Sequence, residues 1–133
     1  MNRKLSILFI SILLFIVISS CEEITKSEVA PKNCEVEVFT TNTAFSKTVK
    51  YEVITTGDLT VEEVKYYSDN GFITITNPTR FPMTLNFTLS DEQDSIGIFA
   101  KSLVQNGKIE LKLSVTANGA TITQEDACSQ IIN

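Results

Sequence analysis

The side chains that could do chemistry in this 133-residue chain are three cysteines and several clustered carboxylates. The chain has no histidine, which excludes Ser-His-Asp and Cys-His nucleophile pairs and every zinc or haem site that needs a histidine ligand. The densest acidic cluster is Asp91-Glu92-Gln93-Asp94, and its oxygens are the ligands that calcium prefers. The cluster lacks the glycine and the later glutamate of an EF-hand loop. We therefore interpret it as a solvated turn and expect neither a metal nor a cofactor.

Two further acidic pairs, Glu62-Glu63 and Glu125-Asp126, could in principle act as the two carboxylates of a glycoside hydrolase. Nothing in their spacing indicates that they converge, and the chain has no tryptophan against which a sugar ring would stack. A carboxylate-based hydrolase is therefore the least favoured function, and we expect a protein that is not an enzyme. The net charge of −5, from 11 basic and 16 acidic residues, also argues against a nucleic acid partner, which would require a basic surface.

The first cysteine follows a hydrophobic leader. Residues 1–20 begin with a short basic segment and continue as the apolar run Leu5–Ile18, which only two serines interrupt. This run is shorter than the roughly 20 residues of a membrane-spanning helix and has the length of the hydrophobic region of a signal peptide. The segment Ile18-Ser19-Ser20-Cys21 resembles the bacterial lipobox, which implies cleavage before Cys21 and acylation of its thiol. An ordinary secretory leader and an uncleaved anchor are the alternatives.

A lipidated Cys21 would fix the location of the protein. Two or three acyl chains hold a protein stably at a membrane, so we expect a lipid-anchored protein of the bacterial cell envelope, at the outer membrane in either its periplasmic or its surface leaflet. Residues 21–33 are polar without an apolar period and predict a flexible tether, which leaves residues 34–133 as the single folded domain. Without residues 1–20 the net charge becomes 9 − 16 = −7.

The two other cysteines, Cys34 and Cys128, lie near the two ends of this domain. Because disulfides persist outside the cytoplasm, we expect a bond between them, which would close a loop of 95 residues (128 − 34 + 1). Two free thiols are the alternative. A zinc or redox site is not expected, since the chain has neither a Cys-x-x-Cys motif nor a histidine.

The chain after the leader is rich in residues that favour β-strands. Threonine, valine, isoleucine, phenylalanine and tyrosine make up 44 of the 113 residues from Cys21 onward, more than a helical domain would use. Apolar and polar residues alternate in several segments, most regularly over Ile109–Val115. Turn motifs separate these segments, at Thr56-Gly57-Asp58, Asp69-Asn70-Gly71, Asn77-Pro78, Asn106-Gly107 and Asn118-Gly119.

These patterns predict eight strands, at about 34–41, 48–56, 60–67, 71–77, 82–90, 95–104, 108–117 and 120–124. Residues 124–133 could form a short turn or add an edge strand. Because each strand has one wet face and one buried face, we expect an all-β fold, an antiparallel immunoglobulin-like β-sandwich of seven to eight strands. A small closed barrel is the alternative.

Several segments share their pattern with one known domain. Val49–Val53 with Gly57 after it would form an opening strand and turn, and Val61–Tyr66 would form the next strand. Further similarity lies in Phe81-Pro82-Met83, Ile98–Leu103, Asn106-Gly107-Lys108-Ile109 and Val115–Gly119. Over about residues 48–124 the chain thus resembles the MmpS-like domain, the periplasmic β-sandwich of small mycobacterial accessory proteins of membrane transport. The resemblance implies an accessory role in a transport or export complex.

Aromatic residues are the best candidates for a recognition surface. Tyr66 and Tyr67 are adjacent, so on a strand they face opposite sides of the sheet, and we expect one of them to be exposed. The segment Asp94-Ser95-Ile96 resembles a bacterial O-glycosylation sequon, which implies a glycan on Ser95. The sequence thus favours a non-enzymatic envelope protein that contacts the membrane through acyl chains on Cys21 and presents a β-sandwich to an envelope protein partner.

Overall fold

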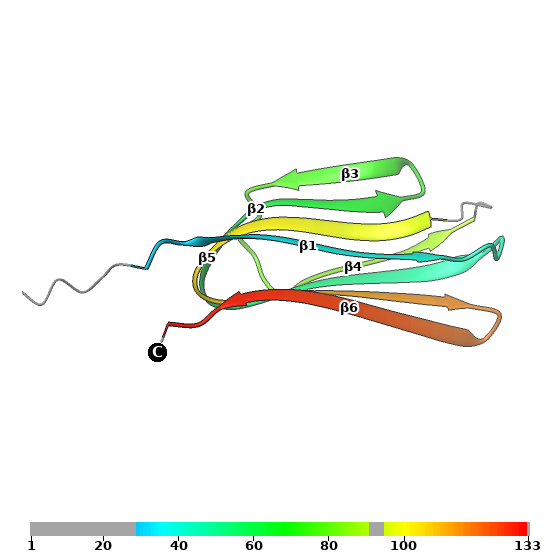
Figure 1. Ribbon diagram of the computed structural model, residues 1–133. Helices are drawn as coiled ribbons and strands as arrows, with labels where there is room; N and C mark the ends of the chain where they lie inside the picture. The colour runs from blue at the N-terminus through cyan, green and yellow to red at the C-terminus, as the bar shows by residue number, and fades with distance from the viewer. Residues whose placement is uncertain (1–28, 91–94, 133) are drawn as a thin grey trace, which may run out of the picture.

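The computed structural model describes residues 29–90 and 95–132, and the secondary structure of these residues is entirely β (Figure 1). The expected all-β fold is confirmed, as one antiparallel sheet. No helix in this part of the chain is long and apolar enough to cross a membrane. The sheet has six strands: β1 (Lys32–Thr41), β2 (Lys47–Ser68), β3 (Gly71–Thr76), β4 (Met83–Leu89), β5 (Ser95–Ala117) and β6 (Ala120–Gln130).

Two strands, β2 and β5, are much longer than expected. They pair with each other from Thr48 and Thr116 at one end to Tyr66 and Ile98 at the other. The expected turns at Thr56-Gly57-Asp58 and Asn106-Gly107 are therefore wrong, because both segments continue the pairing and bend together. Each bend joins two predicted strands into one, which reduces eight strands to six.

Each of the two long strands has a glycine at the bend. The structure explains why these glycines do not form turns. Gly57 and Gly107 lie opposite each other, and Gly57 has a φ of 80°. A Cβ on Gly57 would overlap the carbonyl oxygen of Asn106, and one on Gly107 would overlap that of Thr56. The glycines thus allow two backbones to approach closely within a curved ribbon, which is a second use of glycine besides the turn.

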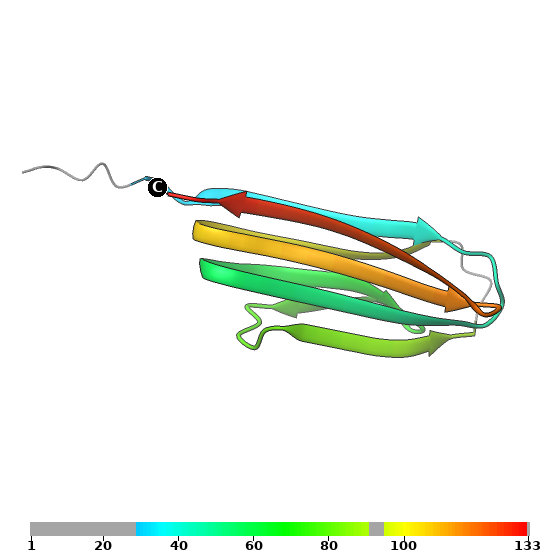
Figure 2. The same ribbon diagram turned by 90° about the horizontal axis from the view of Figure 1, so that it is seen from below.

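Because of this bend the sheet folds back on itself, and its two halves face each other (Figures 1 and 2). In one half, β1 pairs with residues 95–104 of β5, these residues pair with the end of β2, and the end of β2 pairs with β3. We call it the β1/β3 half. In the other half, β6 pairs with residues 107–117 of β5, these residues pair with the start of β2, and the start of β2 pairs with β4. We call it the β4/β6 half.

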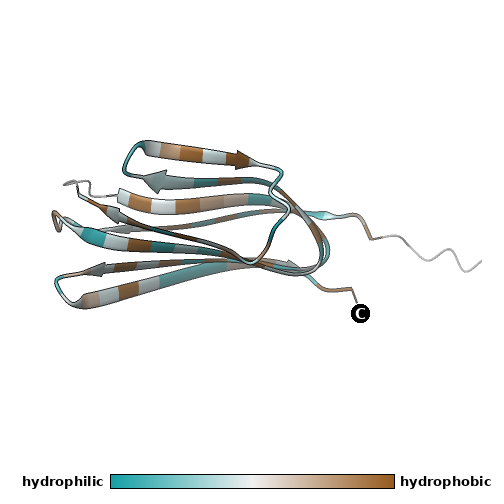
Figure 3. Cartoon of the chain, turned by 180° about the vertical axis from the view of Figure 1, so that it is seen from behind, coloured by the Kyte–Doolittle hydropathy of each residue, from teal (hydrophilic) through white to brown (hydrophobic). Residues whose placement is uncertain are grey.

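The core lies between the two halves. Buried and exposed residues alternate along β1 and along most of β5, and apolar segments alternate with polar ones on the ribbon (Figure 3). Ile109, Leu111, Leu113 and Val115 are all buried, as their alternation predicts. The hydroxyl of Tyr51, in the β4/β6 half, donates a hydrogen bond of 3.0 Å to the backbone carbonyl of Tyr67 in the β1/β3 half. This bond joins the two halves across the core.

The first and last strands meet beside the bend. Residues 124–130 continue β6 as an edge strand, one of the two alternatives that the sequence left open. The expected disulfide between Cys34 and Cys128 is confirmed, with 5.8 Å between the two Cα atoms. The Lys32 ammonium also donates a hydrogen bond to the Ser129 carbonyl at 3.2 Å. The chain therefore enters and leaves the folded domain at the same end.

Candidate binding groove

The outer face of the β1/β3 half carries a row of three aromatic residues and one glycine, one from each of four strands. Phe39 of β1 lies opposite Gly97 of β5, and Tyr67 of β2 lies opposite Phe72 of β3. Because Tyr66 pairs with Ile98, the register places Tyr67 beside Gly97. Residues opposite each other in a sheet share a face, so all four positions lie in one row across the outer face. This row is at the end of the half-sheet that is farther from the bend.

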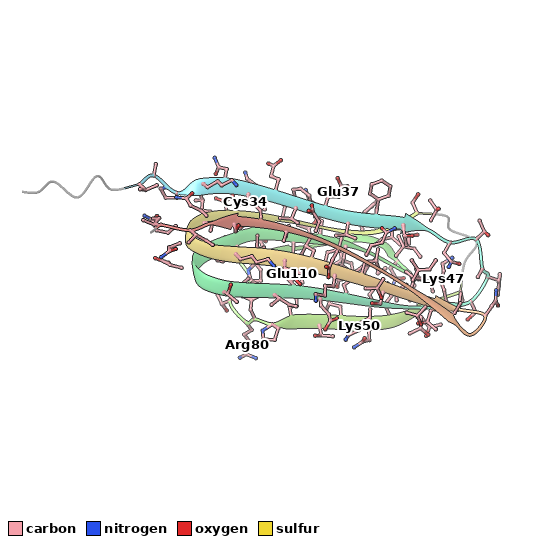
Figure 4. All side chains as sticks on the ribbon, turned by 60° about the horizontal axis from the view of Figure 1, so that its bottom comes forward. Cys34, Glu37, Lys47, Lys50, Arg80 and Glu110 are labelled. Atoms are coloured by element: carbon pink, nitrogen blue, oxygen red, sulfur yellow. A yellow bond between two sulfur atoms is a disulfide. The ribbon has the colours of Figure 1, made fainter. Side chains whose placement is uncertain are left out.

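The neighbouring row on the same face combines charges with a further ring. Glu37 of β1 lies opposite Phe99 of β5, which in turn lies opposite Lys65 of β2. The Lys65 ammonium is 6.0 Å from the centre of the Phe99 ring and makes an ion pair of 2.8 Å with Glu63. Glu37 projects from the outer surface of β1 (Figure 4).

The two rows enclose an open groove of about 590 Å³. Its walls include Phe39, which is 63% exposed, and Phe72, which is 78% exposed. Gly97 contributes no side chain to the floor, and a Cβ there would lie 3.1 Å from the Cβ of Phe39. The volume is in the range of about 300–1,000 Å³ that is typical of ligand sites.

The acids of β1 beside the groove are not neutralised within the described part of the chain. Glu35 and Glu37 are both exposed, and the residues that the structure describes place no lysine or arginine nitrogen within 4.0 Å of either carboxylate. On the other half, by contrast, the Glu110 carboxylate accepts hydrogen bonds from Lys108 and Lys112, and these bonds lower its pKa. The groove thus has an acidic rim along β1.

The expectation that Tyr66 or Tyr67 is exposed is wrong. Tyr66 is half-buried, and its ring packs against Tyr51 at 5.8 Å and Phe87 at 6.1 Å, measured between ring centres. Tyr67 does face outward in the register but is only 5% exposed, and its ring contacts Phe72 edge to face. The exposed aromatic surface that the tyrosines were expected to supply comes instead from phenylalanines on both sides of Tyr67.

The other expected site residues have different positions. Ser95 is exposed at the start of β5 and lines the groove. Cys21 and Asp91–Asp94 lie outside the described residues. Among the residues that the structure describes, no group of three cysteine or acidic side chains could hold a metal ion.

The two acidic pairs considered for hydrolysis are in different halves of the sheet. Glu62 and Glu63 belong to the β1/β3 half, where they form ion pairs with Lys101 and Lys65. Glu125 belongs to β6 in the other half, where its carboxylate is 3.6 Å from the Lys112 ammonium. The structure does not bring the pairs together.

Sequence reasoning missed Phe39, Gly97 and Phe99. A signal was present, because Phe39 is out of phase with the buried Val36 and Val38, and an aromatic residue out of phase points to the wet face. That these residues meet depends on the pairing of four strands, which alternation within one strand does not report.

No protein-family model matches the chain, and no curated protein or solved structure is significantly similar to it. Function is therefore inferred from the groove and from the leader.

Proposed function

We propose that this chain is a non-enzymatic binding protein, anchored by lipid on Cys21 in the bacterial cell envelope, which presents the groove to an envelope protein. The facing halves of the sheet would act as the two layers of an immunoglobulin-like sandwich that holds the groove rigid. The observation that carries the proposal is the exposure of Phe39 and Phe72, 63% and 78%, on one face over a common groove.

An exposed phenylalanine ring does not contribute to the stability of the free protein, but its burial against a partner would stabilise a complex. Burying a phenylalanine side chain contributes about 1.5–3 kcal/mol, so two exposed rings forgo that stabilisation in the free protein. Single exposed apolar residues are ordinary, whereas a cluster rimmed by polar groups is typical of interaction sites. Phe39, Phe72, Glu37 and Lys65 form such a cluster.

The position of the groove suits a tethered protein. β1 begins at Lys32, so it includes the last two residues of the tether proposed for residues 21–33, and Phe39 follows seven residues later, about 23 Å along the strand. The groove therefore lies toward the end of the domain opposite the tether, where a protein partner could reach it. The accessory role that the MmpS-like resemblance implies would be one case, with a transporter as the partner.

The size of the native assembly tests this proposal. Tagged wild-type protein, solubilised from its own cells in mild detergent, should migrate in part as a complex larger than the monomer. Phe72→Ser should return this fraction to monomer size. Phe45→Ser is the matched control, because Phe45 is 66% exposed but lies in the loop between β1 and β2. Equal complex formation by both variants, or no complex for the wild type, would refute the proposal.

A further inference from the structure

We infer that the groove receives a segment of a partner protein in which a lysine or arginine is next to an apolar side chain. This inference rests on the proposed function, namely that the groove binds a protein, and it specifies the chemistry that the groove selects.

The apolar part of the segment would lie over Gly97. In this row Gly97 lies between Phe39 on one side and Tyr67, with Phe72 beyond it, on the other, and Gly97 has no side chain to fill the space beside the Phe39 ring. A leucine-sized or phenylalanine-sized group in this space would contact rings on both sides. It would also remove from water the apolar surface that the free protein exposes.

The basic part would pair with Glu37. This carboxylate is exposed beside the groove and has no cation within 4.0 Å among the described residues, whereas the Lys65 ammonium across the groove already pairs with Glu63 at 2.8 Å. Glu35, two residues earlier on the same face of β1, lies outside the groove and opposite Lys101, so Glu37 is the carboxylate of β1 that faces the segment.

The same observations argue against a lipid surface as the occupant. The acids on β1 would be repelled by anionic headgroups. The groove is also at the end of β1 that is farther from Lys32, and hence from the proposed anchor.

The test uses the purified mature protein in detergent, with its phenylalanines replaced by 4-fluorophenylalanine and observed by fluorine NMR. The Phe39, Phe72 and Phe99 signals report on the groove, and the Phe45 signal is an internal control. Three blocked peptides serve as probes: Thr-Lys-Leu-Lys-Thr, Thr-Glu-Leu-Glu-Thr and Thr-Lys-Ser-Lys-Thr. The lysine-leucine peptide should shift the groove signals at a concentration at least about fivefold lower than either of the others.

Variants of one carboxylate sharpen the test. Glu37→Gln should weaken binding of the lysine-leucine peptide about fivefold, and Glu37→Lys should reverse the preference in favour of the glutamate peptide. Glu125→Gln, which makes the same charge change on the exposed strand β6, should alter binding by less than about twofold.

Three results would overturn the inference. They are equal shifts with all three peptides, no effect of Glu37→Gln, or shifts of the groove signals by anionic lipid vesicles in place of the peptide. The failure of the proposed function can be distinguished from these results. If Phe72→Ser abolishes the native complex while the wild-type groove binds the three peptides equally, the groove binds a protein but the proposed chemistry of the bound segment is wrong.

Discussion

Gly57 of β2 and Gly107 of β5 lie directly opposite each other where the two long strands bend. The absence of a side chain at both positions allows the two backbones to approach at the bend, and the bend brings the β1/β3 half over the β4/β6 half. The compact core therefore depends on this pair.

Gly107→Ala should destabilise the protein by about 3 kcal/mol or more, because the new Cβ would overlap the Thr56 carbonyl and force the backbones apart. Urea denaturation would measure the change. Gly71→Ala is the control, since a Cβ there meets no atom within 4 Å and only the positive φ of 94° opposes it. That variant should lose only about 1–2 kcal/mol. Equal losses at the two positions would contradict the account of the bend.

Tyr51→Phe should lower the stability at neutral pH by about 1–2 kcal/mol, because it leaves the buried Tyr67 carbonyl without the Tyr51 hydroxyl. It should also change the response to alkali. Burial raises the pKa of Tyr51 well above its ordinary value of 10.0, so on raising the pH the unfolded chain loses this proton first. Stability from the protonated hydroxyl is complete below about pH 10 and is lost as the pH rises above it.

Urea denaturation at pH 7 and near pH 11 would test this dependence on pH. Tyr51→Phe should lose less stability over that interval than the wild type does, because the ionising group is gone. Tyr66→Phe, which keeps the Tyr51 hydroxyl, should behave as the wild type does. A wild-type alkaline loss in Tyr51→Phe would show that other groups cause it.

Features of the fold that depend on residues close together in the sequence could be predicted, and most features that depend on distant residues could not. Alternation within a segment placed the strands and correctly buried Leu111 and Leu113, because a period of two is a local consequence of one wet face. With Cys21 assigned to the proposed lipid anchor, only Cys34 and Cys128 remain, which was enough to predict that they pair. The bend at Gly57 could not be distinguished from a turn, since the difference is that Gly107 lies opposite it, 50 residues away.

The groove was harder to predict for the same reason. The adjacency of Tyr66 and Tyr67 predicts one exposed ring, but their exposure depends on Tyr51, Phe87 and Phe72 from other parts of the chain. Gly97 carried no local signal at all. It becomes part of a site only when β1 and β2 flank β5.

Cys34→Ser should lower the stability of the oxidised protein by about 3–5 kcal/mol, since the bond closes a loop of 95 residues (128 − 34 + 1) in the unfolded chain. Thermal denaturation with and without reductant would measure it. In reductant the variant and the wild type should be nearly equal. Two alkylatable thiols in the unreduced mature wild type, found by mass spectrometry, would contradict the prediction.

Cys21→Ala should abolish the lipid anchor, because the acyl chains are proposed to attach to the thiol of Cys21. The variant should accumulate as an unprocessed precursor that incorporates no labelled palmitate. Cys128→Ala, which removes a cysteine of the domain, should still be cleaved and labelled. Palmitate incorporation by Cys21→Ala would exclude this site of lipidation.

The groove itself is tested most directly by photo-crosslinking in living cells. Benzoylphenylalanine replaces Phe72 in one variant and the similarly exposed loop residue Phe45 in the other. Position 72 should give one adduct of defined mass to an envelope protein, which the additional change Glu37→Lys weakens, and position 45 should give little or none. The same adducts from both positions, or none from position 72 while the protein is folded and anchored, would contradict the binding function.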